Sequence, residues 1–260
     1  MKKDFCKTLK RSLILCALAI SGFLLLPSCG KKTIDASKLY AELDLTAPPN
    51  TLTAKEKKAG WQLLFDGKTT NGWHGYNMRG VPAVWKAEDG CIVVHGEGGG
   101  EEQDIITDGI YRNYAFTVEY KLSERSNSGI IFQVKEDPKY KYSYETGPEI
   151  QLLDQGDRPI RDETTSHGAN YSMYAPKARP YHPAGQWNRL LLVVNGNHVT
   201  HFINGVEVVS FEKYSEDWLK RRNSGKWSDY PDWGKFNEGH IALQNHGSKL
   251  WFRNIKIKKL

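Results

Sequence analysis

The sequence predicts an all-β fold, a two-sheet antiparallel β-sandwich of the jelly-roll type with one short helix and a long loop over a cleft. Residues 113–122 alternate apolar and polar side chains, as a half-buried strand does. Asn195-Gly196 and Asn204-Gly205 are tight-turn pairs, and they predict a three-strand meander. Helical signal is thin, with one short helix at residues 215–222 and room for one helical turn within residues 30–58, so short strands and tight turns dominate the pattern.

Short apolar runs between turns predict the remaining strands in chain order. They cover residues 61–65, 83–86, 91–95, 129–134, 190–194, 240–244 and 250–258. Asp89-Gly90 joins two of them as a hairpin. Residues 155–187 show no clear strand pattern, and a long loop in a compact domain is unusual unless it is functional. We therefore expect this loop to form a flap over the cleft.

Residues 147–154 are the stretch that most directly suggests a functional site. As a strand, they place Glu149 and Gln151 on one face and apolar side chains on the other. Asp154 breaks the alternation by one position, and a β-bulge or the strand end could return it to the polar face. The polar face suits the floor of a sugar-binding cleft, and it equally suits a solvated edge strand.

Residues 1–28 resemble the signal peptide of a bacterial lipoprotein. A basic start precedes an apolar run over residues 13–26, which is too short to span a bilayer comfortably. The run ends in LPSC at residues 26–29, which resembles a lipobox and implies cleavage before Cys29 and lipidation of that residue. We therefore expect a lipid-anchored protein of the cell envelope, and the alternative is a secretory peptide with a chance cysteine.

Residues 29–58 are polar and contain Pro48-Pro49, so we expect a tether that lifts the folded domain, residues 59–260, off the membrane. Once the leader is removed and Cys29 is modified, Cys91 alone remains of the four cysteines. An intramolecular disulfide is therefore not expected, despite the oxidising compartment.

The formal net charge of +6 does not indicate a nucleic-acid partner. Residues 1–28 hold five of the 36 basic residues and one of the 30 acidic residues, so the rest of the chain carries only about +2. The sequence has no basic block long enough to follow a phosphate backbone. Its eight tryptophans and thirteen tyrosines suit both a core and surfaces that stack on sugar rings.

Five motifs occur in a fixed order between Ala59 and the C-terminus. They are LFDGKT at 64–69 with GW at 72–73, NSGI at 127–130, GPEIQLLD at 147–154, GQWN at 185–188, and GHIALQNHG at 239–247 with FRNI at 252–255. In this order they resemble the 3-keto-disaccharide hydrolase domain family, long known only as a domain of unknown function. The resemblance implies a concanavalin A-like jelly roll, an envelope location, and an oligosaccharide or glycoside substrate oxidised to a ketone at C3.

A ketone at C3 determines which residues the chemistry needs. It acidifies the hydrogen on C2, so a general base can remove that proton, the enolate can expel the group at C1, and water can add. Glu149 is the expected base, unless it is a structural carboxylate paired with Arg125 or Arg253. His246 is the second catalytic candidate, as base, oxyanion partner or metal ligand, and the alternative is a turn histidine exposed to water.

Six further residues are expected to bind substrate, because they are polar or aromatic and lie on the strand, in the NSGI motif or in the loop. They are Gln151, Asp154, Asn127, Ser128, His167 and Tyr171. No HExxH or paired-histidine spacing occurs, so the cofactor stays open, with a divalent metal at Glu149, Asp154 and His246 as one option.

Two other functions stay open at this stage. An ordinary retaining glycosidase of this fold would resemble Glu-x-Asp-x-x-Glu on one strand, whereas this chain reads Glu149-x-Gln151-x-x-Asp154. A non-catalytic carbohydrate-binding lipoprotein is the other alternative, because jelly rolls serve both purposes. No Gly-rich nucleotide-binding motif is present, so we expect a separate sugar oxidoreductase to form the ketone.

Overall fold

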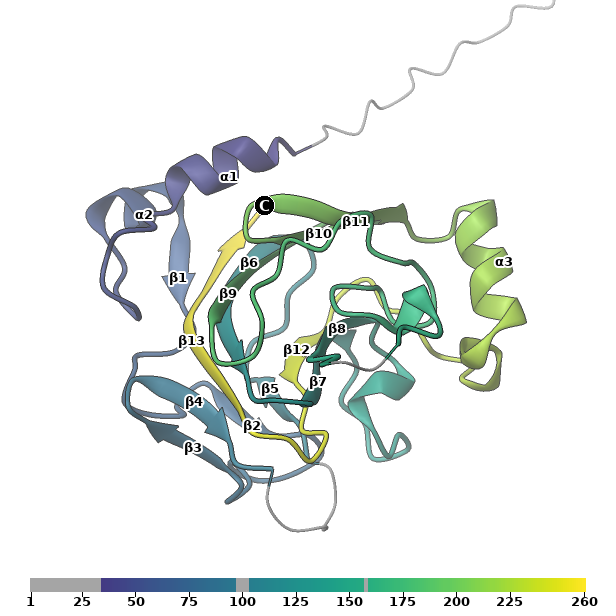
Figure 1. The fold of residues 1–260 in the computed structure, drawn as a ribbon, viewed down its shortest axis with the longest axis horizontal. Coiled ribbons are helices and arrows are strands. Elements are labelled where there is room, and N and C mark those ends of the chain that lie inside the picture. Colours follow the sequence, from purple (N-terminus) through teal and green to yellow (C-terminus); the bar gives the residue numbers. More distant parts are fainter. Residues whose placement is uncertain (1–33, 97–102, 157–158) are drawn as a thin grey trace, which may run out of the picture. The chain divides into compact units, whose positions relative to one another are not determined.

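Two antiparallel sheets build the computed structural model, which describes residues 34–96, 103–156 and 159–260 (Figure 1). The strands are β1 Trp61–Leu63, β2 Trp73–Gly75, β3 Trp85–Glu88, β4 Cys91–Val94, β5 Ile105–Thr107, β6 Tyr114–Leu122, β7 Asn127–Val134, β8 Glu149–Leu153, β9 Trp187–Asn195, β10 His198–Ile203, β11 Val206–Glu212, β12 His240–Leu243 and β13 Leu250–Lys259. The larger sheet has the order β11-β10-β9-β6-β13-β4-β3, with β1 paired to β13, and the smaller has the order β2-β5-β12-β7-β8. The predicted β-sandwich is therefore confirmed.

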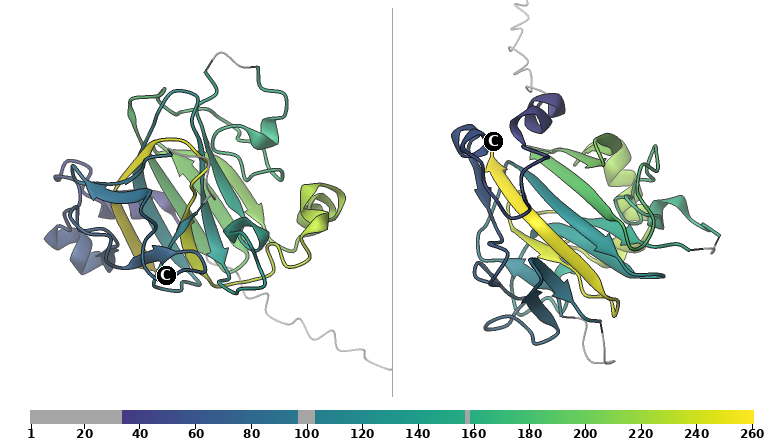
Figure 2. Two further views of the ribbon diagram at one scale, coloured as in Figure 1. Left: turned by 90° about the horizontal axis from the view of Figure 1, so that it is seen from below. Right: turned by 60° about the vertical axis from the view of Figure 1, so that its left-hand side comes forward.

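One hydrophobic core lies between the sheets. Phe116 and Tyr120 on β6 belong to the same buried cluster as Phe132 on β7 and Ile150 on β8, and each is fully buried. Strand side chains alternate, so every second residue of these strands faces this cluster. The two views of Figure 2 show the sheets as layers with the strands of β6, β9 and β13 running side by side.

Tight turns join the strands at the predicted positions or within one residue of them. Asp89 and Gly90 have φ of 50° and 73°, and Asn204 and Gly205 have φ of 48° and 85°. Two successive residues in the left-handed region match the twist of a hairpin, which favours Asx-Gly pairs. In the first turn of the meander, β9 and β10 pair through Asn195 and His198, so the turn lies one residue later than predicted.

The N-terminal part of the described chain packs on the outside of the larger sheet. Helices α1 (Ala36–Glu42) and α2 (Ala54–Ala59) cover it, with Leu39 and Leu43 in a cluster that includes Trp61. Lys256 on β13 forms an ion pair with Glu56, with 2.7 Å between Nζ and Oε1, and both side chains are buried. The predicted tether over residues 29–58 is therefore wrong from residue 34 onward, because Leu39 in α1 and Leu43 directly after it pack into this cluster.

The remaining helices are short. Helix α3 (Glu216–Ser224) begins after Ser215, whose side chain accepts a hydrogen bond from the backbone N–H of Trp218, so the predicted helix and its cap are confirmed. Single 3₁₀ turns follow at η1 Ser143–Glu145, η2 Glu163–Thr165 and η3 Lys226–Asp229. In Figure 1, α3 lies at the opposite end of the sandwich from α1 and α2.

The predicted signal peptide and the lipidation site at Cys29 lie outside the described residues. Within the described part of the chain, no helix has the length and apolar character needed to cross a bilayer.

Candidate active site

The polar face of β8 lines a pocket at one surface of the smaller sheet. Glu149 and Gln151 face this pocket, whereas Ile150 and Leu152 lie in the core between the sheets. The alternation predicted for this strand is therefore confirmed. Both polar side chains are nearly buried, with Glu149 5% and Gln151 3% exposed.

Six segments of the chain meet at the pocket: β7, η1, β8, the loop after β8, η3 and the end of β12. The lining residues are Asn127, Tyr144, Glu149, Gln151, Tyr171, Lys226, Gln244 and His246. Five of these eight, Asn127, Glu149, Gln151, Tyr171 and His246, are site residues that the sequence predicts. The structure thus brings together side chains that are up to 119 positions apart in the sequence, from residue 127 to residue 246.

Glu149 is the group in this pocket with the most unusual electrostatics. Burial is the main cause that raises its pKa to about 8. The charge of Lys226 and a hydrogen bond with Gln244 lower this pKa, whereas the nearby Asp104 carboxylate raises it further. At pH 7 roughly nine tenths of these carboxyl groups therefore carry a proton. When ionised, such a carboxylate is a stronger base than an exposed glutamate.

Gly129 on β7 provides the space that the Glu149 side chain occupies. A Cβ atom at residue 129 would lie 2.7 Å from Cγ of Glu149 and 2.9 Å from Cδ, well inside normal contact distances. The glycine of the NSGI motif therefore permits the close approach that positions the carboxyl group.

Lys226 supplies a positive charge at the pocket and lies against aromatic rings. Its Nζ is 4.5 Å from the ring centroid of Tyr171, 4.7 Å from that of Trp227 and 5.3 Å from that of Tyr144. The surrounding protein lowers the pKa of Lys226, and Glu149 opposes that shift. Trp227 anchors η3, because its ring is buried and its Nε1 donates a hydrogen bond to the carbonyl of Tyr171 at 2.9 Å.

Neutral amides form a second part of the lining. Nε2 of Gln151 donates to Oδ1 of Asn127 at 2.8 Å, which fixes both amides beside Glu149. Ser128 is buried below the pocket, and its hydroxyl donates to the carbonyl of Gln244 at 2.7 Å. Ser128 therefore holds the end of β12 in place, and the structure gives no support for its predicted contact with substrate.

The predicted long loop borders the pocket along the outer edge of β8. The backbone N–H of Gln151 donates to the carbonyl of Ala169 at 3.0 Å, and the N–H of Tyr171 donates to the carbonyl of Glu149 at 2.9 Å. This part of the loop is therefore fixed to β8 like an additional strand. It brings the ring of Tyr171 into the pocket wall.

Two predicted substrate contacts lie elsewhere. His167 is buried, with its Nε2 2.7 Å from Oη of Tyr120 and its Nδ1 3.0 Å from the backbone N of Leu153, and burial lowers its pKa to about 4. Oδ2 of Asp154 accepts a hydrogen bond from the backbone N–H of Arg125 at 2.7 Å. Asp154 follows the end of β8 at Leu153 but does not line the pocket, so its predicted return to the polar face is wrong and it stabilises a turn instead.

The metal option raised by the sequence does not fit this arrangement. Among residues 34–96, 103–156 and 159–260, no three or more His, Cys, Asp or Glu side chains are grouped so that they could hold a metal ion. Glu149 and His246 line the pocket, whereas Asp154 does not. The expected set of three ligands is therefore not assembled.

Sequence reasoning missed Lys226, Tyr144 and Gln244. Gln244 belongs to the GHIALQNHG motif directly before Asn245-His246, so the motif itself was a usable signal. Lys226 and Tyr144 lie in 3₁₀ turns, whose positions depend on tertiary packing and have no periodic pattern.

Comparison with known proteins identifies the family of this chain. The model of the 3-keto-alpha-glucoside-1,2-lyase-like domain matches residues 60–258. A protein of Bacteroides thetaiotaomicron named 3-keto-disaccharide hydrolase is 32% identical over 229 residues, which cover 77% of this chain and 79% of that protein.

Solved structures from Parabacteroides distasonis agree. One is the crystal structure of a candidate glycosyl hydrolase whose sequence is 39% identical to this chain. The match covers 82% of this chain and 100% of that protein's chain, with a TM-score of 0.77. A second such structure is 23% identical with a TM-score of 0.59, covers 77% of this chain and 99% of its own, and shares the fold. The chain therefore belongs to the 3-keto-alpha-glucoside-1,2-lyase-like domain family and is a carbohydrate-active enzyme.

Proposed function

We propose that the protein cleaves 3-keto-glycosides, with 3-keto-disaccharides as the substrate class, by removing the proton on C2. The observation that carries this proposal is Glu149, a buried carboxyl with a pKa of about 8 in a polar pocket beside Lys226. A general base works best when its pKa lies near the working pH, because it is then both available and strong. The name of the Bacteroides relative points to the same substrate class.

The reaction begins when the Glu149 carboxylate takes the C2 proton. The electron pair of the C–H bond forms a C2=C3 double bond, and negative charge develops on O3. When the ketone re-forms, the C1–O bond breaks with its electron pair, and the leaving group takes up a proton. Water then adds to C1, and Glu149, which has exchanged its proton with solvent, returns a solvent-derived proton to C2; this gives net hydrolysis and regenerates the base.

Lys226 is assigned to the charge that develops on O3. Its ammonium lies at the pocket, close enough to Glu149 for each group to shift the pKa of the other. A cation placed beforehand near a developing oxyanion stabilises the transition state more than the uncharged ketone. Lys226 is itself exposed, and the rings of Tyr171 and Trp227 beside its ammonium help to hold it at the pocket.

His246 and the two amides take the remaining roles. His246 is exposed at the rim of the pocket, where an imidazole can give a proton to the leaving oxygen and exchange it with solvent. Gln151 and Asn127 are fixed to each other and can bind sugar hydroxyl groups. Tyr171 provides a ring face against which the keto sugar can pack.

The arrangement does not favour an ordinary retaining glycosidase. That mechanism needs a second carboxyl group about 5 Å from the first, one acting as nucleophile and one as acid. Among the described residues, Glu149 is the only carboxylate that lines this pocket. A single base with a neighbouring cation suits elimination better.

We also propose an envelope location with a lipid anchor at Cys29, for which the lipobox-like LPSC sequence is the support. The substrate must carry a ketone before it reaches Glu149, so an oxidoreductase acting on the C3 hydroxyl of glycosides would supply it.

The test is to offer purified protein a 3-keto-disaccharide and its unoxidised parent, with and without a chelator. We expect cleavage of the oxidised form alone, unaffected by the chelator, and a loss of about 10²- to 10⁴-fold in Glu149→Gln. Glu238→Gln makes the same substitution on an exposed glutamate and serves as the matched control. Equal cleavage of both sugars, or full activity in Glu149→Gln, would contradict the proposal.

A further inference from the structure

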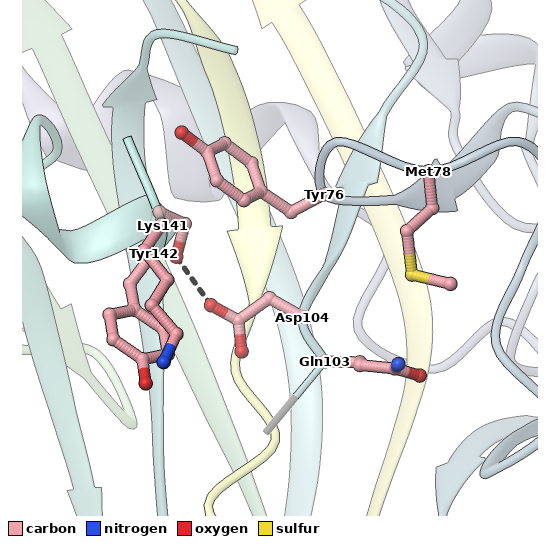
Figure 3. A pocket seen from close by; sticks show the side chains of 7 residues that line it. Tyr76, Met78, Gln103, Asp104, Lys141 and Tyr142 are labelled. Atoms are coloured by element: carbon pink, nitrogen blue, oxygen red, sulfur yellow. Dashed lines mark hydrogen bonds between the residues drawn. The ribbon is translucent and has the colours of Figure 1, made fainter. Parts of the chain in front are cut away.

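A second cavity adjoins the Glu149 pocket on the side of β5. It is lined by Tyr76, Gln103, Asp104, Lys141, Tyr142 and Ser143, together with Met78. Figure 3 shows Asp104 between Tyr142 and Lys141 on one side and Gln103 on the other, with Tyr76 above. None of these residues has a role in the steps at C2 described above.

The two cavities share a wall. Tyr142 lines the second cavity and stacks on Tyr144, which lines the Glu149 pocket; their ring centroids are 5.1 Å apart and the planes differ by 11°. Oδ1 of Asp104 accepts a hydrogen bond from the backbone N–H of Asn245 at 2.9 Å, between the two pocket residues Gln244 and His246.

The charge of Asp104 also reaches Glu149. A group bonded to C1 begins two bonds from C2, the atom whose proton Glu149 removes. The adjoining cavity is therefore within reach of that group.

The chemistry of the second cavity suits a ring that carries several hydroxyl groups. Asp104 accepts hydrogen bonds, Lys141 donates them, and the Tyr142 hydroxyl and the Gln103 amide can do both. The Asp104 oxygens already accept from Ser143 and Asn245, and a carboxylate has further lone pairs for a sugar hydroxyl.

Other ligands fit less well. A wholly apolar leaving group would make no hydrogen bonds with these polar groups, and an anion would face the Asp104 carboxylate.

We infer that this cavity is the subsite for the leaving group, and that the leaving group it takes is a second sugar ring. The inference rests on the proposed function, because it needs a substrate whose C1 substituent departs from the Glu149 pocket. Gln103 and Tyr142 are then specificity-determining residues for disaccharides. Their hydrogen bonds are made to the second ring alone.

The experiment compares two substrates that differ only in this ring: a 3-keto-disaccharide of glucose and methyl 3-keto-glucoside. The variant is Gln103→Ala with Tyr142→Phe, which removes two polar groups and keeps the ring that stacks on Tyr144. Each lost hydrogen bond is worth about 2- to 10-fold. We therefore expect kcat/KM for the disaccharide to fall about 4- to 100-fold, and that for the methyl glycoside to change by less than about twofold. Lys86→Ala, at an exposed position of β3 outside both cavities, is the control.

The outcomes separate the two proposals. A loss confined to the disaccharide supports the subsite. Equal losses on both substrates, or no loss on either, overturn the subsite while the cleavage of 3-keto-glycosides stands. If the unaltered protein cleaves neither substrate, the proposed function itself fails, and the leaving-group assignment falls with it.

Discussion

Replacing Glu149 by glutamine should stabilise the folded protein while it lowers activity about 10²- to 10⁴-fold. In the unfolded chain Glu149 ionises at its ordinary value of 4.5, whereas burial in the folded protein raises its pKa to about 8. Between pH 4.5 and about 8, the folded protein therefore binds one proton more than the unfolded chain. In this pH range the free energy of unfolding falls by about 1.4 kcal/mol for each pH unit. The cost reaches about 3 kcal/mol at pH 7 and about 5 kcal/mol above pH 8. Glutamine has nearly the same shape and carries no charge, so Glu149→Gln removes this cost.

The assay is denaturant unfolding of Glu149→Gln and the unaltered protein between pH 5 and 9. The difference in unfolding free energy should be just under about 1 kcal/mol at pH 5, grow with the slope given above and level off near pH 8. In thermal unfolding at pH 7, about 3 kcal/mol corresponds to a rise in Tm of roughly 6 to 12 °C for a domain of this size. Glu238→Gln, on an exposed glutamate, should follow the unaltered protein. A difference that does not change with pH, or a less stable Glu149→Gln at pH 8, would refute the electrostatic reasoning.

Three further substitutions test the surroundings of the base. Lys226→Met should lower kcat/KM about 10²- to 10³-fold and move the activity profile to higher pH, because the lysine lowers the pKa of Glu149; an unchanged profile would count against this role. Gly129→Ala should cost at least about tenfold in kcat, since its Cβ would displace the Glu149 side chain, and a crystal structure with an unmoved carboxyl would contradict this. Lys256→Met should destabilise the fold by about 3–5 kcal/mol in denaturant, because it leaves Glu56 buried without its partner; a variant as stable as the unaltered protein would show that α2 is not held by this pair.

The strand pattern and turns of the fold could be predicted because they depend on local sequence. The alternation around Glu149 and the Asx-Gly turns act over a few residues, and they set strands and hairpins directly. Helix α1 was missed, because seven residues with one buried leucine give too little signal without the sheet beneath them.

The site could be predicted only in part for the same reason. Glu149, Gln151 and Asn127 lie on paired strands, so their motifs bring them together. Lys226 enters from a turn about 75 residues further along, and its place is fixed by the burial of Trp227 rather than by any local pattern.

The most direct test of C2 proton abstraction is the fate of the C2 hydrogen in heavy water. A 3-keto-disaccharide is cleaved in D₂O, and the released keto sugar is examined by proton NMR at early times. Keto sugar incubated alone measures uncatalysed exchange. Proton removal by Glu149 followed by addition of water predicts deuterium at C2 of every product molecule, at a rate that follows cleavage. Product that retains its original hydrogen at C2 would contradict the mechanism.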